Sequence, residues 1–176
     1  DSIGEYSGLL ARHFIEGEDY ERGAAYSELA SRKANKAASS REVFEHAHNR
    51  ISCLEKFPST ESNIRRVIDA RAALAMYYIN YSHIGKAYEV VSPIADLALR
   101  MDYQKALPMI NAAMGTFQIW YEEDYPKGVQ YLGEVLKSIG NETKGISYWL
   151  TTWNLGWFFS WDCQFEKGIE YFEKSL

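Results

Sequence analysis

Apolar residues recur at three- and four-residue spacing along most of the chain, which predicts a succession of amphipathic helices. Strand-like alternation is scarce, and only four of the 176 residues are proline. We therefore predict an all-α protein. Polar stretches and breaks at glycine or proline separate the helices. The predicted helices span residues 5–15, 20–34, 43–57, 64–81, 86–100, 103–121, 125–139, 145–161 and 165–176.

Several of these breaks have a chemical cause. Asp19 can cap the helix that follows it, and Ser39 or Ser40 with Glu42 two or three residues on forms a similar capping signal. Pro58 should end the helix before it because proline cannot continue the backbone hydrogen bonding. Two further prolines fall within predicted helices: Pro93 predicts a bend or a split within 86–100, and Pro108 blurs the start of 103–121.

An internal repeat of 40 to 44 residues organises the chain. It is clearest near the C-terminus, where Gly156 and Gly168 lie twelve residues apart. We predict that these glycines lie where two paired helices approach most closely, since only a small residue fits there. Aligned on Gly168, the small position recurs at Gly128, Ala87 and Val43.

The pattern LG-x2-F followed by G-x3-F, at residues 155–172, resembles the tetratricopeptide (TPR) helix–turn–helix signature. Three stretches near the start of the chain, residues 10–14, 30–34 and 40–44, carry a narrower resemblance. These stretches are similar to a long-repeat array that follows a predicted ATPase module in large bacterial signalling proteins, among them class III nucleotide cyclases.

The resemblance implies a right-handed superhelix of antiparallel helix pairs, a TPR-like solenoid. Residues 1–176 would then form a single repeat domain of about four to five helix pairs, as a fragment of a longer protein. Stacking of neighbouring pairs would supply the core. The resemblance also implies a regulatory or interaction segment, because the chain contains no motif of an ATPase or cyclase domain.

Composition and motifs exclude several other classes. The net charge of −5, with no lysine or arginine run longer than two, argues against nucleic-acid binding. The two cysteines form no spaced pair, which fits a reduced, cytoplasmic setting, and the apolar run 72–79 is too short to cross a membrane. We find neither a phosphate-binding loop nor a nucleophile motif, so we expect no enzyme activity and no cofactor. His46 and His48 are two residues apart on a helix and should not chelate a metal together.

Four tryptophans repeat at every fourth position of one predicted helix, at Trp149, Trp153, Trp157 and Trp161. Residues at this spacing share one side of a helix. One interpretation is that the indoles line the concave wall of the superhelix, which is the usual binding surface of repeat proteins. The alternative is that they fill the joint with a further repeat.

The concave wall would continue on the helices that precede this one. With a repeat of 40 residues, the positions equivalent to Trp153 and Trp157 are Ala113 and Phe117. The predicted binding residues are Trp153, Trp157, Phe117, Trp120 and Met76.

Three hypotheses for function follow. The first is a non-catalytic module that binds a protein or peptide, or a neighbouring domain of the same chain, on its concave face. The second is a small-molecule sensor that regulates an attached effector such as a nucleotide cyclase. The third is a structural spacer that self-associates through apolar surface on its end repeats. We expect neither nucleic acid nor a membrane as a partner.

Overall fold

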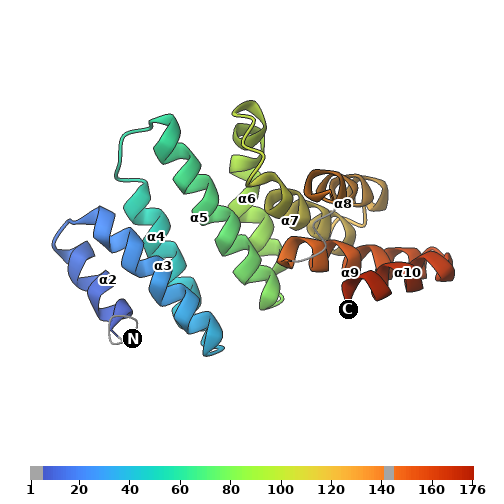
Figure 1. Cartoon of the computed structure of the whole chain (residues 1–176), viewed down its shortest axis with the longest axis horizontal. Helices are drawn as coiled ribbons and strands as arrows, with labels where there is room; N and C mark the ends of the chain where they lie inside the picture. The colour runs from blue at the N-terminus through green and yellow to red at the C-terminus, as the bar shows by residue number, and fades with distance from the viewer. Residues whose placement is uncertain (1–5, 141–144) are drawn as a thin grey trace. The chain divides into compact units, whose positions relative to one another are not determined.

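The computed structural model describes residues 6–140 and 145–176, and within them it contains nine α-helices and no strand (Figure 1). The all-α prediction is confirmed for this part of the chain. Glu5, the first residue of the first predicted helix, lies outside the described residues. The helices are α2 (Ser7–Glu16), α3 (Tyr20–Lys36), α4 (Ser40–Leu54), α5 (Glu61–Asn80), α6 (Ile84–Arg100), α7 (Leu107–Trp120), α8 (Tyr125–Ile139), α9 (Ile146–Trp161) and α10 (Phe165–Ser175).

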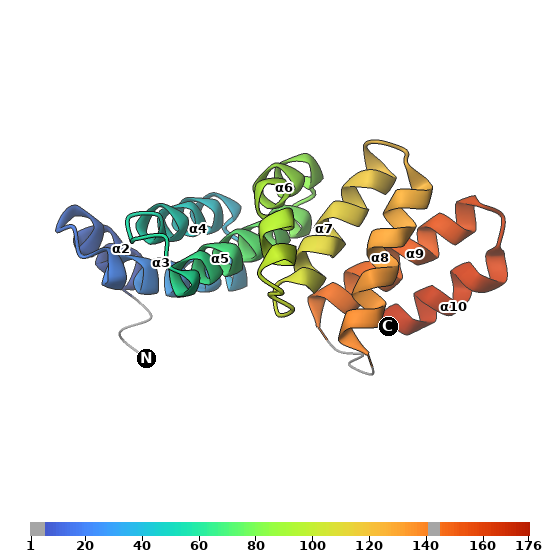
Figure 2. The same ribbon diagram turned by 90° about the horizontal axis from the view of Figure 1, so that it is seen from above.

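The chain divides into two compact units, Asp1–Ser82 and His83–Leu176. Helices α2 to α5 belong to the first unit and α6 to α10 to the second. The division lies in the turn between the helices predicted at 64–81 and 86–100. In the first unit α3 packs against both α2 and α4, and in the second α7 pairs with α8 and α9 with α10 (Figure 2).

Side-chain caps start several helices. The Asp19 carboxylate accepts a hydrogen bond from the backbone N–H of Arg22 at 3.1 Å, which confirms the predicted cap of α3. Thr60 and Asp124 cap α5 and α8 in the same way. Ser39 precedes the first residue of α4 but makes no side-chain cap. The signal at that position therefore predicted the place of the helix start and not its hydrogen bond.

The prolines shift helix boundaries by a few residues from their predicted places. Helix α4 ends at Leu54, three residues short of the prediction at 57, because the residue before Pro58 avoids the helical conformation. Helix α6 continues through Pro93 without a split. Pro108 lies in the first turn of α7, where a missing N–H leaves no intrahelical bond unmade.

Among the described residues, six turns have one non-glycine residue in the left-handed region. In the last turn, the backbone N–H of Gln164 bonds to the carbonyl of Phe159 at 2.9 Å, and in the first that of Asp19 bonds to Phe14 at 2.8 Å. Hydrogen bonds of this kind, from an N–H to the carbonyl five residues earlier, end a helix at a residue in the left-handed region. No sequence pattern indicated these residues, which are Glu18, Ala38, Ser82, Asp102, Glu123 and Cys163.

The glycines of α9 and α10 lie at a close helix–helix contact. A Cβ on Gly156 would lie 2.7 Å from Cδ1 of Phe172, and one on Gly168 would lie 3.2 Å from the carbonyl oxygen of Gly156. Both positions therefore exclude a larger side chain, as predicted. The preceding pair has the same contact, since a Cβ on Gly128 in α8 would lie 3.2 Å from the carbonyl oxygen of Gly115 in α7.

Candidate functional site

The last helix pair exposes an apolar surface built on the tryptophans of α9. The four indoles are 42%, 38%, 37% and 49% exposed in chain order, and Ile169 on α10 is 58% exposed. Phe172 of α10 lies half-buried beside them. We call this surface the tryptophan face, and it comprises Trp149, Trp153, Trp157, Trp161, Ile169 and Phe172.

The rings of the tryptophan face hold one another in place. Trp149 stacks on Trp153 with centroids 6.0 Å apart, and Trp157 lies 5.9 Å from Trp161. Trp153 and Trp157 both pack edge-on against the Phe172 ring, at 5.4 and 5.8 Å. Aromatic pairs in these arrangements are favourable. The surface is therefore largely ordered before any partner arrives, which lowers the entropic cost of binding.

The glycine contacts fix which residues of α7 correspond to these tryptophans. Gly115 and Gly156 lie 41 residues apart, so Trp153 corresponds to Ala112 and Trp157 to Thr116. The sequence-based register of 40 was wrong by one residue for the first helix of the pair, although it holds for Gly128 and Gly168. Ala112 and Thr116 are buried.

The corresponding side of the α7–α8 pair is covered by α9 and α10. In the α7 register, Trp161 corresponds to Trp120, and the Trp120 indole N–H donates to the side-chain oxygen of Asn154 in α9 at 2.6 Å. The two indoles also meet edge to face at 5.0 Å. On α8, Leu132 is packed with Leu155 of α9. Partly buried side chains that pack around this cluster are Val129 and Leu136 of α8, Phe159 of α9 and Tyr171 of α10.

The predicted binding residues do not all lie together. Trp120 joins the α9 tryptophans through its contacts with Asn154 and Trp161. Phe117 lies on another side of α7, where it stacks on Tyr88 of α6 with centroids 3.9 Å apart. Met76 belongs to the first unit and is 5% exposed, so its side chain offers little surface to a ligand.

Sequence reasoning missed the part of the surface that α10 contributes. Ile169, at 58% exposure, corresponds to Val129 of α8 when the two helices are aligned on Gly168 and Gly128. That alignment was visible in the sequence. What was not visible is that one of the two positions is covered and the other is open.

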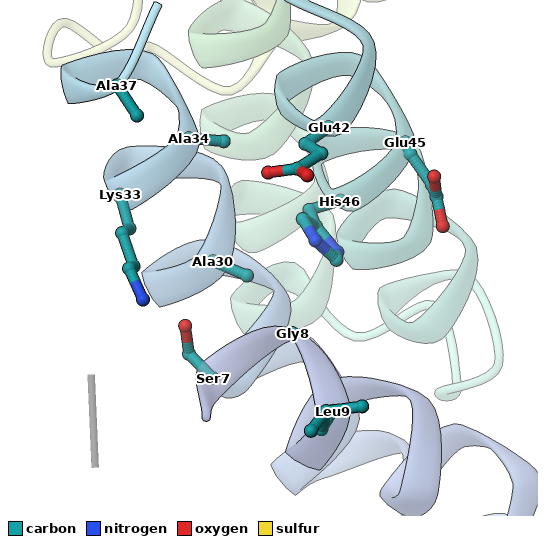
Figure 3. A pocket seen from close by; sticks show the side chains of 10 residues that line it. All are labelled: Ser7, Gly8, Leu9, Ala30, Lys33, Ala34, Ala37, Glu42, Glu45 and His46. Atoms are coloured by element: carbon teal, nitrogen blue, oxygen red, sulfur yellow. The ribbon is translucent and has the colours of Figure 1, made fainter. Parts of the chain in front are cut away.

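A second candidate is a cavity of about 370 Å³ between α2, α3 and α4 (Figure 3). Glu42 points from α4 toward α3, which carries Lys33, whereas the His46 ring extends from α4 toward Gly8 of α2. The Nδ1 atom of His46 is buried and has no hydrogen-bond partner among the described residues. The volume of the cavity lies within the range of small-molecule sites. The lining residues are Ser7, Gly8, Leu9, Ala30, Lys33, Ala34, Ala37, Glu42, Glu45 and His46.

The two neighbouring histidines of α4 face different helices. The His46 ring lies close to Gly8 of α2, whereas Nε2 of His48 is 2.8 Å from the hydroxyl of Tyr78 in α5. The two side chains therefore point to different sides of α4, as their spacing predicts. Across residues 6–140 and 145–176, no group of three or more His, Cys, Asp or Glu side chains is arranged to hold a metal ion.

Nor does any helix in the described ranges combine the length and apolar character needed to cross a membrane.

No protein-family model matches the chain, and no curated protein and no solved structure matches it either.

Proposed function

We propose that this chain is a non-catalytic protein-interaction module of the TPR type, in which the tryptophan face binds an apolar helix of a protein partner. In this proposal the helix pairs stack as a right-handed superhelix within a cytoplasmic bacterial signalling protein. The partner is a peptide, another protein or a neighbouring domain of the same chain. The observation that carries the proposal is the set of four ordered, exposed indoles on one side of α9.

The chemistry of α9 suits a helical partner. The helix contains no charged residue, so an apolar partner can cover it without burying an unpaired charge. The indoles follow one another by about one helical turn, which matches apolar residues spaced by three and four on a partner helix. Tryptophan is also the residue type most enriched at the energetic centre of protein interfaces.

Selection of helical peptides tests this proposal. Peptides displayed on phage are enriched on the immobilised chain, and their affinities are measured by calorimetry against the wild type and Trp153→Ala. We expect Trp153→Ala to weaken binding by about tenfold or more, as at other interface hot spots. Tyr121→Ala is the matched control, because Tyr121 is an exposed aromatic residue outside the tryptophan face. Equal affinity for the wild type and Trp153→Ala would refute the proposal.

The alternative is a small-molecule sensor that regulates an attached effector such as a nucleotide cyclase. The cavity beside His46 supports it, since its volume suits a small molecule and charged side chains of Lys33, Glu42 and Glu45 line it. A smaller cavity of about 210 Å³ lies among Tyr125, Phe158, Trp161 and Asp162. A sensor would show a rise in melting temperature with a nucleotide, amino acid or organic acid from a screening panel. That rise should be lost in His46→Ala if the larger cavity is the site.

A further inference from the structure

We propose that the partner of the tryptophan face is the α2–α3 hairpin of a second copy of this chain, so that copies associate head to tail. This inference rests on the proposed function, because it names the partner of the same surface. It draws on one interface that already exists within the second unit, where the α9–α10 hairpin packs on the α7–α8 hairpin.

In the α7–α8 hairpin, the side that corresponds to the tryptophan face is covered by the next hairpin, α9–α10. Three apolar side chains of α8 pack around the contact with α9 and α10. Aligned on Gly128 and Gly168, the three corresponding positions, two in α10 and one directly after its last residue, are apolar, and none of them is fully buried. The corresponding pairs are Val129 and Ile169, Leu132 and Phe172, and Leu136 and Leu176.

The α2–α3 hairpin carries the side chains that form the other half of this interface. Gly23 of α3 lies against Ile15 of α2 as Gly168 of α10 lies against Ser160 of α9. Counted from these glycines, three positions that face α8 in the last hairpin hold identical residues in the first. The pairs are Leu10 and Leu155, Phe14 and Phe159, and Tyr26 and Tyr171. We call Leu10, Phe14 and Tyr26 the Leu10 face.

The two sets of side chains also share their geometry. Phe14 stacks on Tyr26 with centroids 5.3 Å apart and planes 13° apart, and Phe159 stacks on Tyr171 at 5.4 Å and 10°. A cation lies over each phenylalanine, from the arginine or lysine at the equivalent position of the hairpin. The Leu10 face therefore presents the shape that α8 already accommodates within the second unit.

Among the described residues of the first unit, no helix covers the Leu10 face, because α4 packs on the other side of the α2–α3 hairpin, where a Cβ on Gly8 would lie 3.2 Å from Nε2 of His46. Leu10, Phe14 and Tyr26 are each half-buried. Nearby on the same hairpin, Tyr6 and Leu9 are well exposed. Both halves of the proposed interface are thus apolar, and each is partly exposed within its own unit.

The proposed interface departs from the internal one at two places. Trp153 and Trp157 replace the small Ala112 and Thr116, so an incoming hairpin meets a bulkier surface and lies farther out than α9 lies on α7. Leu9 stands where the last hairpin has Asn154, so the equivalent of the Trp120 hydrogen bond is missing. Association should consequently be weaker than the internal contact and should bury the indoles.

The two faces differ, so the contact is heterologous and a copy with both faces can add a neighbour at each end. We expect the weight-average mass of the full chain, measured by sedimentation equilibrium, to rise continuously with concentration. Ile169→Glu places a charge in the tryptophan face, and Leu10→Glu places one in the Leu10 face. Each substitution should weaken association by about tenfold or more. Leu99→Glu is the matched control, since Leu99 is exposed on α6 outside both faces.

A mixing experiment separates head-to-tail pairing from other modes. At a concentration where the wild type associates and each variant alone is largely monomeric, an equimolar mixture of Ile169→Glu and Leu10→Glu should form a 1:1 dimer that grows no further. If Leu10→Glu disturbs the helical circular dichroism, Leu9→Glu replaces it, because Leu9 is more exposed.

Two results would overturn the inference. One is a chain that stays monomeric at every concentration, and the other is a Leu10→Glu variant that still self-associates like the wild type. In either case, selected peptides that bind the wild type but not Trp153→Ala would leave the proposed function standing. Peptides that bind Trp153→Ala as tightly as the wild type would refute the proposed function, whatever the weight-average mass of the chain.

Discussion

Replacing Gly128 by alanine tests whether α7 and α8 are in backbone contact. A Cβ at this position would lie 2.5 Å from Cγ1 of Ile119 and 3.2 Å from the carbonyl oxygen of Gly115. Carbon atoms in favourable contact lie about 3.5–4.0 Å apart. The Ile119 side chain must therefore move by about 1 Å, and the backbone carbonyl cannot turn away without shifting α7.

The expected effect follows from two opposing terms. Alanine gains about 1 kcal/mol over glycine in a helix interior, whereas overpacking a tight contact costs about 1–3 kcal/mol. The nearby backbone carbonyl places the cost in the upper part of that range. We expect Gly128→Ala to lower the free energy of unfolding of the second unit by about 1–2 kcal/mol.

Gly133→Ala is the control in the same helix, because no atom lies within 4 Å of a Cβ at Gly133. It should raise the free energy of unfolding by about 0.5–1 kcal/mol. Urea unfolding followed by tryptophan emission suits the comparison, since all five tryptophans belong to the second unit. A difference of 2 kcal/mol between the variants corresponds to a midpoint separation of about 1 M urea.

The result that would refute this reasoning is a Gly128→Ala variant at least as stable as Gly133→Ala. It would mean that α7 and α8 are separated by more than the glycine contact allows. The register that relates Gly115 to Gly156 would then lose its basis, and the correspondence between Trp120 and Trp161 with it.

Three further predictions concern other contacts. Trp120→Phe should cost about 1–3 kcal/mol in urea unfolding, because it leaves the buried side-chain oxygen of Asn154 without its donor. Hydrogen bonds from the backbone N–H and the guanidinium of the arginine in the first turn of α3 lower the pKa of Asp19. Its carboxylate therefore stabilises the fold above the unfolded-state pKa of about 4, and this contribution is lost as the pH falls through the lower folded-state pKa. Between neutral and acidic pH, the thermal unfolding midpoint measured by circular dichroism should therefore fall less in Asp19→Asn than in the wild type. Burial raises the pKa of the Cys53 thiol, so a disulfide reagent should modify exposed Cys163 in the native chain and Cys53 only after unfolding.

Local chemistry in the sequence determined the helices and most of their ends. Helical periodicity and the Asp19 cap depend on residues within one or two turns of each other, so they can be recognised without the fold. The contact of Gly156 with Gly168 was also predictable, because a short turn brings both glycines together whatever surrounds the hairpin. Errors arose where one residue changes a boundary, as at Pro58.

Only the tertiary structure decided which apolar residues are covered. Val129 and Ile169 occupy the same position in α8 and α10, yet Val129 packs on the next hairpin and Ile169 is exposed. The one-residue difference in register between Gly115–Gly156 and Gly128–Gly168 likewise moved the equivalents of Trp153 and Trp157 to a different side of α7. Burial depends on what packs against a helix from elsewhere in the chain, and a helical pattern records only which side is apolar.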